Sequence, residues 1–269
     1  MPFTTAHPAI VLPLKQWFPR WFSLTGLMAG AMTPDLVYFL ALRTVFRGLS
    51  HSWLGLLLVS LPLGVIFSFV FHRFFKYPFI RHLPSPLDKF LSGLAQSDWK
   101  VAGVRAWVIL VISVLVGALS HFFWDAFTHP TGQIASRWPL LQQEVTLLGQ
   151  SRLVCRILQH ASTVAGTLMI VLYAVKGGII PKAKTVETKV AAREKWIFWW
   201  IGGIVALGFA IAAVVVFNSL FNWALQLGRN RFLAVQTFGL SVWAGFFYWT
   251  IIYGLMRRQA TFVAAPTKE

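Results

Sequence analysis

Residues 106–125 read AWVILVISVLVGALSHFFWD, an apolar run that ends in a histidine and an aspartate. Residues 106–120 carry no charged side chain and, with their flanks, approach the length that a helix needs to cross a bilayer. His121 and Asp125 are four residues apart, so a helix places both side chains on one face, one turn apart. The stretch therefore predicts a membrane helix that offers a nitrogen and an oxygen ligand to one cation.

Further apolar runs of similar length indicate a polytopic protein. They lie at about 54–71, 161–175, 196–217 and 232–256. Residues 21–46 are also apolar, but Pro34 and Asp35 in their middle predict a broken helix that is only partly inserted. The sequence thus predicts an all-α fold, a polytopic membrane helical bundle.

The charges exclude some functions and set a topology. The chain has 24 Lys and Arg against 8 Asp and Glu, a net charge of +16. The basic residues gather in the connections 72–105 and 176–195 and after 256, without forming a continuous stripe. Positive-inside bias explains this pattern, so no nucleic-acid partner is expected. We predict a multi-pass protein of the bacterial inner membrane with these segments, including the C-terminus, in the cytoplasm.

This topology groups seven polar residues at the external boundary. They are His7, Asp35, His51, His121, Asp125, His129 and His160. His72 and His82 fall at the opposite boundary, across about 30 Å of hydrocarbon, and are excluded as partners. Cys155 is the single cysteine, so a metal site here must use nitrogen and oxygen ligands.

The pattern of apolar runs and charges divides the chain into four segments. Residues 1–175 form a membrane-embedded helical domain with the candidate ligands, and 176–195 form a basic cytoplasmic linker. Residues 196–258 form a two-helix transmembrane anchor, and 259–269 form a tail. Within the first segment, the loop 130–160 is expected to carry a short helix near 140–148.

Each candidate ligand has a simpler alternative when taken alone. Asp125 can accept a hydrogen bond from His121, and Asp35 can cap a helix N-terminus. His51 and His160 can be interfacial residues at the start of a span, and His7 can lie in a flexible tail. Together these residues offer more ligand atoms than one cation needs, which favours a divalent-metal site that activates water and clamps a phosphoryl oxygen.

Four short motifs carry a resemblance. They are Met1-Pro2-Phe3-Thr4-Thr5-Ala6-His7-Pro8-Ala9, Thr33-Pro34-Asp35, Ser50-His51-Ser52 and His121-Phe122-Phe123-Trp124-Asp125. They resemble an uncharacterised family of bacterial membrane proteins that is similar to the inner-membrane metal-dependent hydrolases regulated by the SOS response. The resemblance covers roughly residues 1–175.

The order of the ligands also resembles, more distantly, the zinc-dependent phospholipase C and S1/P1 nuclease superfamily, an all-helical fold with three zinc ions. It implies a phospholipase C-like helical N-terminal half in which the seven residues above follow the ligand order. The chain departs from the patterns at three places. Val164 stands where that superfamily has glutamate, only three residues separate Asp125 from His129, and Phe46 replaces a histidine usual in the membrane hydrolases. One or two ions, zinc or manganese, are therefore expected rather than three.

The resulting functional hypothesis is a metal-dependent hydrolase of phosphoesters, in particular of phospholipid headgroups reached from the outer leaflet. His51, His121 and Asp125 bind the principal ion, and His7, Asp35 and His160 complete a second site. Asp35 or Asp125 orients the attacking water as a base. Arg47 and Arg152 are candidate phosphate ligands, chosen for their charge and predicted side.

Two functions of other classes stay open: a haem-binding electron carrier that uses pairs of these histidines, and a transporter or lipid-binding scaffold. A catalytically inactive relative of the hydrolases is a third possibility.

Overall fold

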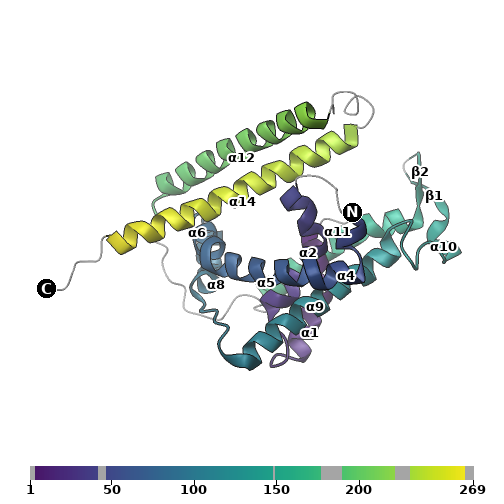
Figure 1. The fold of residues 1–269 in the computed structure, drawn as a ribbon, viewed down its shortest axis with the longest axis horizontal. Helices are drawn as coiled ribbons and strands as arrows, with labels where there is room; N and C mark the ends of the chain where they lie inside the picture. Colours follow the sequence, from purple (N-terminus) through teal and green to yellow (C-terminus); the bar gives the residue numbers. More distant parts are fainter. Residues whose placement is uncertain (1–3, 42–46, 148, 177–189, 222–230, 264–269) are drawn as a thin grey trace. The chain divides into compact units, whose positions relative to one another are not determined.

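The computed structural model describes residues 4–41, 47–147, 149–176, 190–221 and 231–263. Helices account for almost all of the regular structure in these residues, and β-structure is limited to one hairpin (Figure 1). Five of the helices are long and apolar enough to cross a membrane: Trp53–Arg81, Gly103–Thr128, Val154–Val175, Ala192–Val216 and Phe238–Met256. The predicted all-α polytopic bundle is confirmed, and each of the five predicted apolar runs overlaps one of these helices.

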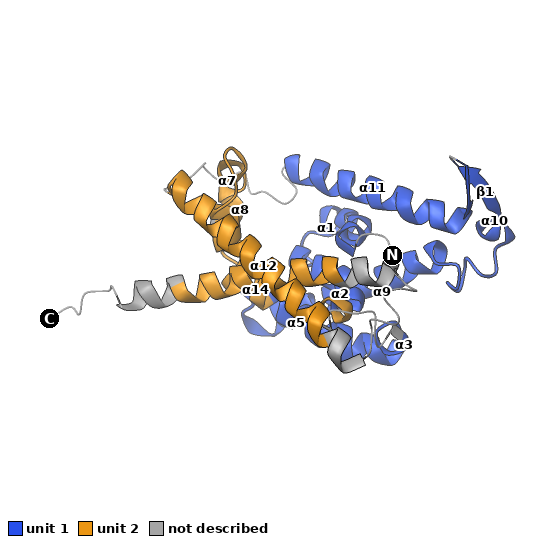
Figure 2. Ribbon diagram, turned by 90° about the horizontal axis from the view of Figure 1, so that it is seen from above, with its two compact units in different colours: residues 1–36, 47–68, 100–180 blue, residues 37–46, 69–99, 181–269 orange. Residues whose placement is uncertain are grey.

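The chain forms two compact units, coloured separately in Figure 2. Unit 1 comprises 1–36, 47–68 and 100–180, and unit 2 comprises 37–46, 69–99 and 181–269. The last two apolar helices thus group with residues 69–99 of the first long connection. The predicted linker 176–195 lies mostly outside the described residues, and the predicted four-segment division stays a prediction.

Unit 1 contains most of the N-terminal half. Its elements are the 3-10 helix η1 (Thr4–Val11), α1 (Leu12–Trp17), most of α2 (Leu24–Ala41), α3 (Arg47–Ser50), α4 (Trp53–Gly55), the π-helical turn η2 (Leu56–Ser60), most of α5 (Leu61–Val70), α9 (Gly103–Thr128), α10 (Pro139–Gln142), β1 (Glu144–Leu147), β2 (Gln150–Leu153) and α11 (Val154–Val175). Helix η1 contacts α1, α9 and α11. Val11, Leu27 and Ala31 form a small apolar core there, so residues 4–11, including His7, are packed against the helices.

Helix α2 continues through Pro34, contrary to the predicted break. Proline has no N–H and removes the hydrogen bond that the carbonyl four residues earlier would accept. The hydroxyl of Thr33 donates to that carbonyl, the oxygen of Gly30, at 2.8 Å. A neighbouring hydroxyl thus supplies the missing donor, as in other apolar helices that contain proline. Asp35 consequently lies inside a continuous helix and is buried.

Helices α2 and α9 approach closely through small residues. A Cβ atom added at Gly30 would lie 2.0 Å from the carbonyl oxygen of Val114, and one added at Gly117 would lie 2.2 Å from the oxygen of Leu27. The pattern Gly26-x-x-x-Gly30 on α2 thus faces Ser113 and Gly117 on α9, as expected for helices that pack in a membrane. This contact brings the Asp35 end of α2 against the His121 end of α9.

The loop between α9 and α11 differs from the prediction. The expected helix near 140–148 is limited to α10, and residues 144–153 form an antiparallel hairpin. Val145 and Thr146 are β-branched and favour a strand. Gly149 has φ of 75°, a conformation that few other residues adopt and that the tight turn between β1 and β2 requires.

Unit 2 contains η3 (Phe71–Phe75), α6 (Lys76–Arg81), α7 (Leu87–Phe90), α8 (Ser92–Gln96), α12 (Ala192–Phe221) and α14 (Arg231–Val263). Helices α12 and α14 lie side by side (Figure 1). At one end of α12, Lys195 forms an ion pair with the buried Asp88 of α7. In the same unit, Tyr253 of α14 contacts His82 Nε2 at 3.1 Å.

Candidate metal centre

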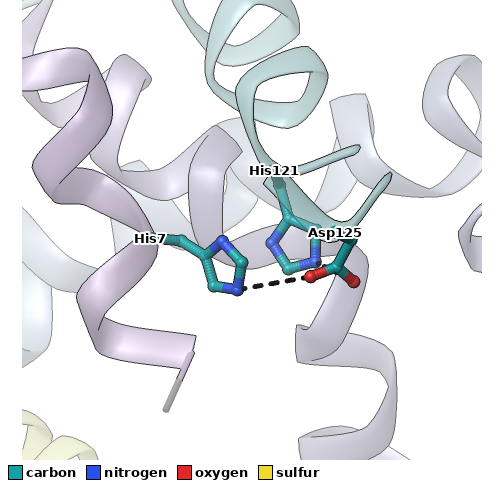
Figure 3. A group of neighbouring side chains, drawn as sticks. All are labelled: His7, His121 and Asp125. Carbon is teal, nitrogen blue, oxygen red and sulfur yellow. Dashed lines mark ion pairs between the residues drawn. The ribbon is translucent and has the colours of Figure 1, made fainter. Parts of the chain in front are cut away.

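Five of the predicted ligands converge in unit 1, from segments far apart in the sequence. His7 comes from η1, Asp35 from α2, His51 from the turn between α3 and α4, and His121 and Asp125 from the end of α9. His7, Asp35 and His121 are buried, while His51 and Asp125 are partly accessible. Figure 3 shows His7 beside the pair on α9. These buried groups could hold a metal ion.

Four ligand atoms form one compact set, which we call the central set: Asp35 Oδ1, His51 Nε2, His121 Nε2 and Asp125 Oδ2. His51 Nε2 lies 3.7 Å from Asp35 Oδ1 and 3.6 Å from Asp125 Oδ2. His121 Nε2 lies 3.8 Å from Asp35 Oδ1 and 3.5 Å from Asp125 Oδ2.

These separations favour ion ligands over hydrogen-bonded pairs. A charge-assisted hydrogen bond between nitrogen and oxygen spans about 2.7–2.9 Å, shorter than all four distances. Two ligands of a tetrahedral zinc ion, each about 2.0–2.1 Å from the metal, lie about 3.3–3.4 Å apart. Each of the four nitrogen–oxygen distances is therefore close to the separation of two ligands on one zinc ion.

Several atoms of the site lack a hydrogen-bond partner among the described residues. They are both ring nitrogens of His7, Asp35 Oδ1, His121 Nε2 and Asp125 Oδ1. A buried polar atom without a partner costs about 1–3 kcal/mol, so several in one place need a physical reason. Divalent cations would satisfy most of these atoms, because an ionised carboxylate oxygen offers a lone pair and so does one of the two ring nitrogens of a neutral imidazole.

A second pair of histidines faces the other oxygen of Asp125. His7 Nε2 lies 3.8 Å from Asp125 Oδ1, the pair dashed in Figure 3, and His129 Nδ1 lies 3.4 Å from the same oxygen. The ring of His7 stacks on that of His121, with centroids 3.9 Å apart. Asp125 thus presents one oxygen to the central set and the other to His7 and His129, an arrangement that lets one carboxylate serve two ions.

The protonation state of His7 suits a ligand. Burial, reinforced by the neighbouring His121, lowers its pKa to about 3, although Asp125 acts in the opposite direction. The imidazole is therefore neutral near pH 7, the form that binds metal ions.

Contacts around the central set orient two of its ligands. The backbone oxygen of Ala31 can only accept, so His121 Nδ1, 2.8 Å away, donates to it. A neutral His121 then carries its lone pair on Nε2, toward the central set. The hydroxyl of Thr4 donates to Asp35 Oδ2 at 2.8 Å, which leaves Asp35 Oδ1 for the central set.

A cavity of about 230 Å³ opens beside this site. It is lined by His51, Trp53, Phe122, Asp125, Ala126, His129, Thr131, Gly132 and Gln133. The ring of Phe122 stacks on His51, with centroids 5.8 Å apart, so one wall of the cavity is aromatic. A small polar group with an apolar extension can reach Asp125 and His51 from this side.

The structure does not bring every predicted residue to the site. His160 is exposed on α11 and belongs to neither metal-capable group of the described residues. Val164, at the position where the superfamily has glutamate, is also exposed. Gln159, one residue before His160, is buried instead, with Nε2 3.5 Å from His129 Nε2.

Neither of the two predicted phosphate ligands is confirmed. The Arg47 side chain lies outside the described part of the chain. Arg152 is exposed on β2 and donates to Gln150 at 2.5 Å. His72 and His82, which the topology excludes as partners, belong to unit 2.

Sequence reasoning overlooked three supporting features: the Thr4 hydroxyl, the Ala31 carbonyl and the glycines between α2 and α9. The spacing of Gly26 and Gly30 is a signal for close helix packing and could have indicated the contact between α2 and α9. The first two depend on the tertiary approach of η1, α2 and α9, for which the sequence has no local signal.

Comparison with known proteins places the chain in a family without assigning an activity. No curated protein and no solved structure matches it significantly. The resemblance to metal-dependent hydrolases therefore stays a prediction. Residues 1–255 match a family described as a domain of unknown function, DUF4184. The chain is a member of the DUF4184 family.

Proposed function

We propose that the protein is a membrane-bound, metal-dependent hydrolase of phosphoesters. The observation that supports this most is the central set, in which the imidazole nitrogens of His51 and His121 lie 3.5–3.8 Å from carboxylate oxygens of Asp35 and Asp125, beside an open cavity. A purely structural cluster would be expected to close these gaps with hydrogen bonds, because buried polar atoms without partners destabilise a fold.

The residues take distinct roles in this proposal. Asp35, His51, His121 and Asp125 would hold one ion, and His7 and His129, which lie beside Asp125 Oδ1, would be ligands of a second. Zinc suits a tetrahedral set of nitrogen and oxygen ligands, and manganese is the alternative. A bound divalent ion lowers the pKa of water and polarises a phosphoryl oxygen.

Asp125 is the carboxylate placed to orient the attacking water by accepting a hydrogen bond from it, and the proton of a water activated by a bound ion would pass to solvent through the open cavity. It lines the cavity, whereas Asp35 is buried behind it and is held by Thr4. Phe122 and Trp53 keep one wall apolar, which favours an ester with a hydrophobic part. Phospholipid headgroups combine such a part with a phosphoester, and the charge bias of the connections supports a site at the external face of a bacterial inner membrane.

The test is hydrolysis by detergent-purified protein loaded with zinc or manganese. Phospholipids in mixed micelles and a soluble phosphodiester are offered side by side. We expect metal-dependent release of a phosphorylated headgroup or of phosphate, lost in Asp125→Asn and retained in the matched control His160→Ala. Activity that survives chelation and Asp125→Asn would reject this assignment, and so would the absence of hydrolysis by a fully metal-loaded protein across these substrates.

A further inference from the structure

The segment between α9 and α11 exposes large apolar side chains although it is not a candidate membrane span. Trp138 is 49% exposed, Leu140 52%, Val145 41% and Leu147 47%. Exposed apolar side chains on a candidate membrane helix face lipid, but on a polar loop a group of them marks a surface that binds something.

The register of the hairpin separates two chemically different faces. Residues directly opposite each other in an antiparallel pair share a face, and neighbours along a strand alternate. Val145 pairs with Arg152 and Leu147 with Gln150, and we call these four residues the basic apolar face.

The other face of the hairpin carries its acidic residue, Glu144, which pairs with Leu153, a residue that packs against the buried cluster of Ala135, Leu141 and Cys155. Thr146 pairs with Ser151, and the hydroxyl of Ser151 donates to Glu144 Oε2 at 2.6 Å. The carboxylate is therefore turned away from Arg152, so the basic apolar face combines hydrophobic side chains with positive charge.

The hairpin lies in the connection between two candidate membrane helices. Helix α9 ends at Thr128, and α11 begins at Val154, directly after β2. Both helices are long and apolar enough to span a bilayer, and they contact each other. Figure 1 shows β1, β2 and α10 gathered at this end of unit 1. Because the chain leaves the bilayer through one helix and returns through the next, the hairpin stays close to the lipid headgroups.

We propose that the basic apolar face, together with Trp138 and Leu140, inserts into the headgroup layer of anionic phospholipids. Val145 and Leu147 reach the boundary of the acyl chains, as the apolar side of an interfacial element does. Tryptophan is enriched at this depth, and a guanidinium binds phosphate oxygens while its stem lies along the apolar layer. This surface is independent of the metal centre and of the proposed hydrolysis.

Size and charge favour a lipid surface over a protein partner. A stable protein interface buries about 800 Å² on each side, which a hairpin of two four-residue strands cannot supply alone. Arg137 and Arg156 are also exposed near the hairpin, so the segment attracts an anionic surface.

The experiment measures which face of the hairpin contacts lipid in the full-length protein. Cys155 is buried and is the chain's single cysteine, so Cys155→Ala provides a background for labelling. An environment-sensitive fluorophore is attached to Val145→Cys, to Leu147→Cys and, as the matched control on the opposite face, to Thr146→Cys. Each protein is reconstituted into vesicles of phosphatidylglycerol or of phosphatidylcholine, and quenching by a lipid-borne nitroxide is compared with quenching by iodide in water.

We expect the nitroxide to quench labels at 145 and 147 severalfold more than the label at 146, and more in phosphatidylglycerol than in phosphatidylcholine. Arg152→Gln should reduce the difference between the two lipids, because Arg137 and Arg156 remain. Equal accessibility of all three positions to iodide would overturn the proposal. Protection of 145 and 147 that persists in detergent, without dependence on lipid charge, would also overturn it, because it indicates a second copy or a protein partner.

A measurement without substitutions guards against variants that fail to fold. Amide hydrogen exchange of residues 144–153 in the unmodified protein should be severalfold slower in phosphatidylglycerol nanodiscs than in phosphatidylcholine nanodiscs. Identical exchange in the two lipids would contradict the proposal regardless of how the labelled variants behave.

Discussion

Replacing Gly30 with alanine should damage both the packing of unit 1 and the metal centre. The added Cβ would lie 2.0 Å from the carbonyl oxygen of Val114 and 2.9 Å from its Cα. A carbon and a carbonyl oxygen normally approach to about 3.3 Å, so α2 and α9 must separate locally by about 1 Å. Both obstructing atoms belong to the backbone of α9, and no side-chain rotation can relieve the clash.

The size of the effect follows from this displacement. Overpacking of this kind costs about 1–3 kcal/mol, which for a chain of this size lowers the melting temperature by about 2–12 °C. The same movement draws Ala31 and Asp35 of α2 away from His121 of α9. Loss of a contact that orients a ligand weakens metal binding by about 10–100-fold.

Two assays on detergent-purified protein check these values: thermal unfolding of the metal-free form, and zinc affinity by competition with a chelator. The matched control is Gly203→Ala on α12, because an added Cβ there has no atom within 4 Å. The control should leave zinc affinity unchanged and leave the melting temperature unchanged or slightly higher, because alanine favours a helix more than glycine does. If Gly30→Ala behaves like Gly203→Ala in both assays, the close approach of α2 and α9 is wrong, and so is its role in positioning the site.

Three further substitutions test separate contacts. Thr4→Val removes the hydroxyl that binds Asp35 Oδ2, so zinc affinity should fall about 10–100-fold at unchanged helicity, and an unchanged affinity would deny Thr4 an orienting role. His160→Ala should leave the zinc content per chain as it is, because this side chain is exposed and outside the site, and a loss of zinc would return it to the ligand set. Lys195→Met removes the ion-pair partner of the buried Asp88 and should lower the free energy of unfolding by about 3–5 kcal/mol, with partial recovery in Lys195→Met/Asp88→Leu. A change within the error of the assay would show that this pair does not stabilise unit 2.

Hydropathy alone predicted the membrane helices, because an apolar run of sufficient length has few alternatives to a spanning helix. It did not predict that α2 continues through Pro34, since the outcome depends on one hydroxyl, that of Thr33. It also missed the hairpin at 144–153, where the left-handed turn at Gly149 decides against a helix.

The spacing of His121 and Asp125 placed both residues on one face, and the structure brings that face to His7, Asp35 and His51. Charge counting grouped those residues by membrane side but could not give the rotation of each helix about its axis. Helix α11 illustrates the limit, because it buries Gln159 and exposes the neighbouring His160. Successive residues of a helix point about 100° apart around its axis, so Gln159 lies beside His129 while the neighbouring His160 is exposed.

The central claim is that the central set binds a metal ion, and elemental analysis of the purified protein tests it most directly. Wild type is compared with His121→Ala/Asp125→Ala, after reconstitution with zinc or manganese and removal of the excess. We predict at least one ion per chain in wild type and none in the double variant. A wild type without stoichiometric metal, or a double variant that retains it, would contradict the account.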